Sequence, residues 1–199
     1  MQTPSHFLLT AVLHRKIPRS TGRPIHGAVL LFGSVLPDIP FMLLTIVYAI
    51  SYRWFASPPT TGSIMEYLHF DLFYTHPVWI IGHNFFHSLI INIFLLGLGY
   101  WGMRRRWRWA RPLFWLSIGT LFHTVIDIFT HHSDGPLLFF PLNWTYRFPS
   151  PISYWESAYY GRAFAIFEYT VDILIIAYFV WVWRRNVNTP HLQASEGES

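Results

Sequence analysis

Long apolar stretches recur along the chain, and shorter polar or basic stretches separate them. Four of these apolar stretches reach about 20 residues, the length that a helix needs to cross the hydrocarbon core of a bilayer. They run approximately over Gly27–Ile50, Val78–Trp101, Pro112–Thr130 and Ala163–Trp183. The pattern therefore predicts four transmembrane helices.

The two ends of the chain differ from these spans. The stretch Pro4–His14 is apolar but too short to cross a bilayer, and it lacks the basic region and cleavage site of a signal peptide. We expect it to stay in the mature protein as a half-span or an interfacial helix. Residues 186–199 are polar and predict a flexible cytoplasmic tail. The predicted fold class is all-α: a polytopic membrane helical bundle formed by one domain over residues 1–185, with long outer loops.

Composition supports a membrane protein. Hydrophobic residues make up 52% of the chain and charged residues 12%, whereas soluble domains contain about 25% charged residues. The net charge is +4, but Lys16 is the only lysine and the arginines form blocks between apolar stretches, which argues against nucleic-acid binding. The absence of cysteine excludes disulfides, thiolate nucleophiles and cysteine zinc ligands.

The basic blocks predict the orientation of the chain in the membrane. Lys and Arg in short loops next to a span stay on the cytoplasmic side. The blocks precede the first span, connect the second and third spans, and follow the fourth span: Arg15, Lys16, Arg19 and Arg23; Arg104, Arg105, Arg106, Arg108 and Arg111; Arg184 and Arg185. We therefore expect both termini in the cytoplasm and the long connections 51–77 and 131–162 outside, as flaps over the mouth of the bundle.

Ionisable residues inside the predicted spans are the candidates for chemistry. The second span holds two histidines and the third a histidine and an aspartate, each pair at positions i and i+4 on one helix face. The first span adds an aspartate at a similar depth, and no Lys or Arg lies in the spans as a counter-charge. Imidazole and carboxylate groups bind zinc and similar divalent metals. A metal site is therefore predicted from Asp38, His83, His87, His123 and Asp127.

Further residues extend this site as open alternatives. Glu168 and Asp172 of the fourth span are candidate ligands or proton acceptors, and hydrogen bonding to a ligand histidine is the alternative. His6 joins the site if the N-terminal helix is a half-span. His131, His132 and Asp134, directly after the third span, either complete a second metal site or face water. Outside the membrane, Arg147 and Arg162 are candidates for binding an anionic headgroup.

The order of the polar motifs resembles a known family, the bacterial and archaeal inner-membrane proteins described as membrane-bound, metal-dependent hydrolases (YdjM-like). The matching strings are TPSHFLL, GSVLPDIP, HNFFHS and HTVIDIFTHHSDGPLLFFPL. The resemblance implies a bacterial or archaeal inner-membrane location and metal binding at His6, Asp38, His83, His87, His123 and Asp127. The succession is also loosely similar to the ligand order of zinc-dependent phospholipase C. Pro40 stands where the family has a second acid, and Asn84 where it has a basic residue.

The leading hypothesis is a membrane-embedded hydrolase of a lipid or lipid-linked ester, preferably a phosphoester, in which a divalent metal activates water. Zinc is the expected metal, with manganese or iron as alternatives. The same His/Asp cluster would also suit a metal or proton transporter, or a haem-binding electron carrier with two axial histidines. A structural subunit with buried polar pairs is the remaining alternative. The expected partners are the lipid bilayer and a lipid substrate, without nucleic acid.

Overall fold

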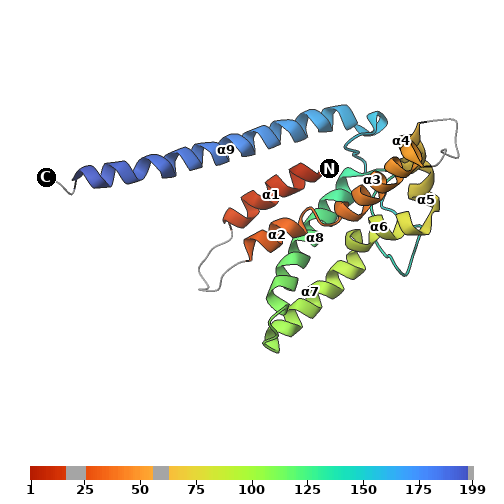
Figure 1. The fold of residues 1–199 in the computed structure, drawn as a ribbon, viewed down its shortest axis with the longest axis horizontal. Coiled ribbons are helices and arrows are strands. Elements are labelled where there is room, and N and C mark those ends of the chain that lie inside the picture. Colours follow the sequence, from red (N-terminus) through yellow and green to blue (C-terminus); the bar gives the residue numbers. More distant parts are fainter. Residues whose placement is uncertain (17–25, 56–62, 197–199) are drawn as a thin grey trace.

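The computed structural model describes residues 1–16, 26–55 and 63–196. Within these ranges the secondary structure is helical, apart from one isolated antiparallel bridge between Leu137 and Arg147. The helices form a bundle with one much longer helix, α9, beside it (Figure 1). The predicted all-α class is confirmed.

The N-terminal helix α1, Thr3–Lys16, is the predicted short helix. It packs against α2, α8 and α9, and Figure 1 shows it lying alongside the first half of α9. Ser5, His6 and Thr10 are its buried residues. The helix therefore brings the start of the chain into the bundle.

The first predicted span is a broken helix. It consists of α2, Gly27–Gly33, and α3, Asp38–Trp54, which meet at an angle of 55°. Pro37 explains the break, because proline lacks a backbone N–H and its ring clashes with the carbonyl group four residues earlier. The new helix begins directly after this proline, and Asp38 is its first residue.

The second predicted span is also broken. Helices α6, Pro77–His87, and α7, Leu89–Arg104, meet at 47°. Ser88 between them has an extended backbone, and its hydroxyl group caps α7 by accepting a hydrogen bond from the Ile91 N–H. The break frees the Phe86 carbonyl group, which accepts a hydrogen bond of 2.8 Å from Asn92 Nδ2. Such pairing permits irregular backbone at membrane depth, where water does not replace a lost hydrogen bond.

The third and fourth predicted spans are continuous. They correspond to α8, Ala110–Thr130, and to the part Gly161–Val187 of α9, Gly161–Glu196. In the described part of the chain, these are the two unbroken helices long and apolar enough to cross a membrane. The number of spans reaches four if each bent pair counts as one. The prediction of four spans is therefore supported within a range of two to four.

Helix α9 extends into the polar segment for which the sequence predicts a flexible tail, and the flexibility of that segment stays a prediction. The helix continues to Glu196, so residues 186–196 are helical, and residues 197–199 lie outside the described residues. A helix that has already formed gains one hydrogen bond with each added residue. Polarity alone is therefore not sufficient to end it.

The described parts of the connections 51–77 and 131–162 contain short structural elements. The first contains the short helices α4, Ile64–Glu66, and α5, Phe73–Thr75, joined by a π-helical turn η1, Tyr67–Leu72. Leu68 and Leu72 of this connection form a core with Trp79 of α6. The second connection contains the Leu137–Arg147 bridge and the short 3₁₀ helix η2, Ser157–Tyr159.

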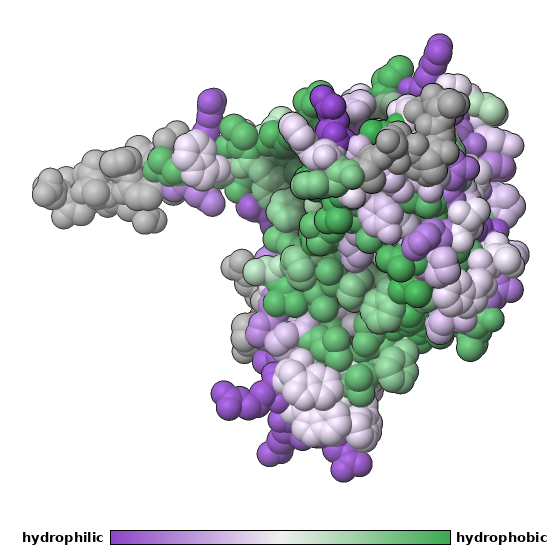
Figure 2. All heavy atoms as spheres, turned by 45° about the vertical axis from the view of Figure 1, so that its right-hand side comes forward, coloured by the Kyte–Doolittle hydropathy of each residue, from purple (hydrophilic) through white to green (hydrophobic). Residues whose placement is uncertain are grey.

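The surface agrees with a membrane environment. Figure 2 shows hydrophobic side chains over the middle of one face, while hydrophilic side chains gather at the lower end, where α7 and α8 meet in Figure 1. In the span of α9 little of the surface is buried within the protein, and Ile166, Ile173 and Leu174 are among its exposed apolar residues. An exposed apolar surface of this extent suits contact with lipid.

Candidate metal centre

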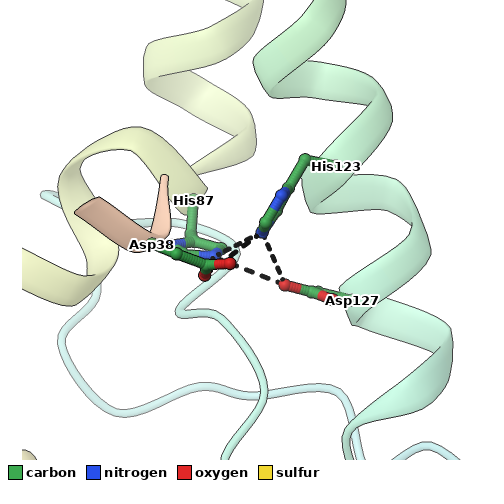
Figure 3. Close-up of side chains that lie close together, drawn as sticks. All are labelled: Asp38, His87, His123 and Asp127. Atoms are coloured by element: carbon green, nitrogen blue, oxygen red, sulfur yellow. Dashed lines mark hydrogen bonds and ion pairs between the residues drawn. The ribbon is translucent and has the colours of Figure 1, made fainter. Parts of the chain in front are cut away.

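Four of the predicted ligands converge on one point. Within the described ranges, Asp38, His87, His123 and Asp127 each offer an atom, and these atoms lie within 4.8 Å of one another. Figure 3 shows the four side chains turned toward one another. Asp38 is the first residue of α3 and His87 the last residue of α6, so the two helix breaks place one ligand each. Helix α8 supplies the other two.

The distances between these atoms suit a single metal ion. His87 Nε2 lies 3.0 Å from His123 Nε2, and Asp38 Oδ1 lies 3.5 and 3.4 Å from these two nitrogens. Asp127 Oδ2 lies 3.4 and 2.9 Å from the same nitrogens. A tetrahedral zinc ion with bonds of about 2.0–2.1 Å separates its ligand atoms by about 3.3 Å. The four groups therefore already have nearly the spacing of a zinc site.

Backbone carbonyl groups orient both ligand histidines. His87 Nδ1 donates to the His83 carbonyl group at 2.6 Å, and His123 Nδ1 donates to the Ser34 carbonyl group at 2.8 Å. A carbonyl oxygen only accepts, so each ring carries a proton on Nδ1 and presents Nε2 to the carboxylates and to the other ring. Nε2 of each ring is therefore the atom that would ligate a bound cation. This arrangement is the usual one for metal-binding histidines.

Close contact between α2 and α8 positions His123. A Cβ atom added at Gly33 would overlap the Leu116 carbonyl oxygen, and one added at Gly119 would overlap the Leu30 carbonyl oxygen. Small residues let two membrane helices approach this closely. The approach brings the Ser34 carbonyl group against the His123 ring, one turn along α8 from Gly119.

His6 contacts the centre without belonging to the group of four. Its Nε2 lies 2.9 Å from Asp127 Oδ1, and its ring stacks on the His123 ring with the centroids 3.7 Å apart. Thr3, also in α1, donates a hydrogen bond of 2.5 Å to Asp38 Oδ2. Helix α1 therefore contacts each carboxylate through the oxygen that does not face the nitrogens of His87 and His123.

Glu168 and Asp172 lie at the contact between α1 and α9. Glu168 is buried and accepts a hydrogen bond of 2.7 Å from the Gln2 backbone N–H. Asp172 accepts one of 2.7 Å from the Ser5 hydroxyl group. The structure does not bring either carboxylate into the group of four. Both instead hold α1 against α9.

His83 also lies outside the group of four. Its ring stacks on the His87 ring with the centroids 4.5 Å apart, and it contacts the rings of Phe41 and Phe73. Both of its ring nitrogens are buried and lack a hydrogen-bond partner among the described residues. The i, i+4 spacing puts both histidines on one face of α6, but only His87 reaches the centre.

The remaining candidates, which follow α8 or begin α9, lie outside the group of four. His131 Nδ1 donates to the Asp127 carbonyl group at 3.1 Å, and burial lowers the pKa of His131 to about 3, so the ring is neutral. His132 bonds to the Ser150 carbonyl group and stacks on Tyr159. The Arg147 guanidinium group donates to the Gly135 carbonyl group and lies over the Phe73 ring, and burial lowers its pKa. Arg162 is exposed.

Asn84, where the resembled family has a basic residue, is hydrogen-bonded to the connection 131–162. Its Oδ1 accepts a hydrogen bond of 2.7 Å from the Leu137 N–H, and its Nδ2 donates to the Ile80 carbonyl group. Asn84→Ala should leave the buried Leu137 N–H unpaired and lower the free energy of unfolding by about 1–3 kcal/mol. Thermal unfolding in detergent measures the change, with the exposed Asn186→Ala as control. Equal stability of both variants would contradict this role.

Sequence reasoning missed several supporting residues. Thr3, the Ser34 carbonyl group and the Gly33–Gly119 contact were not predicted. Two glycines within apolar spans are a recognisable signal of close helix packing, and they could have pointed to the α2–α8 contact. The pairing of Thr3 with Asp38 joins residues far apart in the sequence and carries no local signal.

Taken together, the fold and the centre define a polytopic helical membrane protein with buried histidine and aspartate side chains grouped as a candidate metal site. The model of the YdjM inner membrane protein family matches residues 1–189, so the chain belongs to that family. It is a multi-pass inner membrane protein. Curated proteins and solved structures yield no match, so the loose similarity to zinc-dependent phospholipase C gains no support.

Proposed function

We propose that this protein is a membrane-embedded, metal-dependent hydrolase of a lipid or lipid-linked ester, preferably a phosphoester. The observation that carries the proposal is the group of Asp38, His87, His123 and Asp127, whose atoms have the spacing of a metal site. Both aspartates also line a cavity of about 920 Å³. A reactive centre at the wall of a cavity is the arrangement expected of an active site.

The donor set fits a divalent cation. Two imidazoles and two carboxylates suit zinc, and manganese or iron are alternatives. When bound, such a cation supplies Lewis acidity, which polarises an ester oxygen and lowers the pKa of water. The residues that would hold it are the four of the group, with His6 supporting Asp127 and Thr3 supporting Asp38.

Asp38 is the member of the group that the cavity reaches most easily. Its side chain is 27% exposed, whereas that of Asp127 is 5% exposed. A water molecule that approaches from the cavity therefore meets Asp38 first, and we infer that Asp38 orients it by accepting a hydrogen bond. Glu168 and Asp172 are engaged with α1, which favours a supporting role for them over proton acceptance.

The setting favours a lipid substrate. Phe41, Met42 and Ile46 of α3 form an apolar part of the cavity wall, and α3 belongs to a candidate membrane span. The basic blocks at both ends of the chain and between α7 and α8 favour cytoplasmic termini. In this orientation the cavity opens toward the outer half of the bilayer.

Metal removal tests the proposal directly. Purified protein should hold about one zinc, manganese or iron ion per chain by elemental analysis, without the Soret band of haem. Chelation should abolish hydrolysis of phospholipid in mixed vesicles, and addition of the same metal should restore it. Asp38→Asn should lower activity at least about 100-fold, because it removes a charged ligand.

The matched control is Asp71→Asn, which changes an exposed aspartate of η1. This variant should keep both its metal and its activity. Wild-type protein that holds no metal even after reconstitution would contradict the proposal, and so would full hydrolysis in the presence of chelator. If the protein binds a metal but hydrolyses neither phospholipids nor polyprenyl-phosphates, the metal site would be supported and the proposed reaction would be contradicted.

A further inference from the structure

His83 is a half-buried residue whose two ring nitrogens are buried and are not used by the candidate metal centre. Its two ring nitrogens lack a hydrogen-bond partner among the described residues, although the side chain is enclosed by the rings of Phe41, Phe73 and His87. A neutral imidazole carries one N–H donor and one acceptor. Buried polar groups are usually paired, and an exception calls for a ligand, an ion or a water molecule as the missing partner.

His83 contributes to the same cavity as the candidate metal ligands. Asp38, Asp127 and His83 all line it. The His83 ring lies directly against the His87 ring, whose Nε2 faces the group of four. A ligand that fills this cavity is therefore bounded by both Asp38 and His83.

The remainder of the cavity wall is largely apolar and continues to the surface. Met42 and Ile46 of α3, Met65 of α4 and Phe70 of η1 line the cavity. Each of them is also about half exposed, between 47% and 52%. One wall of the cavity thus connects the polar centre with the outer, apolar side of the bundle, as a molecule with a polar head and a hydrocarbon chain would require.

We propose that His83 binds the phosphate group of a lipid substrate by donating a hydrogen bond, while the hydrocarbon chain of that lipid lies along Met42, Ile46, Met65 and Phe70. The inference rests on the proposed function, because it names the substrate class of the same site. It assigns His83 to the substrate, whereas the sequence resemblance implied a metal ligand.

Charges of both signs surround the cavity: the Met1 ammonium group also lines it, and it lies 3.0 Å from Asp127 Oδ1. Two further carboxylates line the cavity, those of Glu66 and Asp134. They belong to α4 and to the loop after α8, and they repel a phosphate group. Asp134 is already hydrogen-bonded to Trp155 Nε1 at 2.9 Å. A divalent cation together with the His83 N–H would provide the attraction that an anionic headgroup needs.

Binding of two probes tests the proposal. Inorganic phosphate and dihexanoyl phosphatidic acid are titrated calorimetrically into the purified full chain, both zinc-loaded and zinc-free. His83→Phe keeps a ring against Phe41 and Phe73 but removes both nitrogens. It should bind both probes about 10–100-fold more weakly, the loss expected for one hydrogen bond to a charged group. Its zinc content should stay at the wild-type level.

Two further variants sharpen the result. His83→Gln supplies an amide N–H donor and should recover part of the affinity. It also provides a test if His83→Phe fails to fold. Ile46→Ser should lower the affinity for the lipid probe about tenfold and leave the affinity for inorganic phosphate unchanged. The reason is that only the lipid buries a hydrocarbon chain against this residue.

The outcomes separate this inference from the proposed function. Wild-type affinity of both His83 variants for phosphate would overturn the inference, and so would loss of zinc in His83→Gln, which would make His83 a ligand. If wild-type protein holds no metal, the proposed function fails. The role of His83 in phosphate binding is then tested in the zinc-free proteins, where the wild type should bind phosphate more tightly than His83→Phe does. Absence of phosphate binding in all forms overturns the inference.

Discussion

His123→Ala is expected to remove the bound metal and to abolish hydrolysis. The substitution deletes the ring nitrogen that lies within 3.0 Å of His87 Nε2 and within 2.9 Å of Asp127 Oδ2. Loss of a residue that only supports a ligand already costs about 10–100-fold in metal affinity, so loss of a ligand should cost more. Elemental analysis after dialysis against a weak chelator measures the effect.

The same substitution has a second consequence in the metal-free protein. The His123 ring also stacks on His6 and donates to the Ser34 carbonyl group. Its removal leaves the Ser34 carbonyl group unpaired, and we expect the unfolding temperature in detergent to fall. His132→Ala is the matched control, because that ring stacks on Tyr159 outside the centre. An active, metal-replete His123→Ala protein would refute the assignment of this site.

Hydrophobic patterning predicted the helical class but not the shape of the spans. Apolar length reports how far a segment can extend through lipid, and it correctly located α8 and α9. It cannot show a bend, because a break in a helix leaves the segment equally apolar. Pro37 was the available signal for the first break. The break at Ser88 depends on Asn92 and Phe86, and this pairing appears only in the folded chain.

The candidate site was predictable where its geometry is local. His123 and Asp127 lie one turn apart on one helix, and α8 is unbroken, so their spacing was sufficient to place them together. The same reasoning treated His83 and His87 alike. His87 ends α6 and reaches the group of four, whereas His83, one turn earlier, packs against Phe41 and Phe73.

Contacts between distant segments account for what could not be predicted. Glu168 and Asp172 are on one helix face, which suggested a chemical role, but their partners are Gln2, directly before α1, and Ser5 in α1. Helix spacing gives the face on which a side chain lies but not the element that covers that face. The short α1 therefore decided the roles of residues more than 160 positions away.

Gly119→Ala is expected to disrupt the metal centre without changing a ligand. The added methyl group would overlap the Leu30 carbonyl oxygen and the backbone at Gly33. Because these atoms are backbone, α2 has to move away from α8, and the Ser34 carbonyl group moves with it. We expect the free energy of unfolding to fall by about 1–3 kcal/mol. Metal affinity should fall about 10–100-fold, because His123 loses its orienting partner.

Gly97→Ala is the matched control for this prediction. It makes the same change within α7, where nothing lies within 4 Å of an added Cβ atom. Alanine stabilises a helix interior by about 0.5–1 kcal/mol relative to glycine, so this variant should be at least as stable as the wild type and keep its metal. Metal titration and thermal unfolding of both variants give the comparison. If Gly119→Ala behaves like Gly97→Ala, the close approach of α2 to α8 does not orient His123, and the centre must depend on its side chains alone.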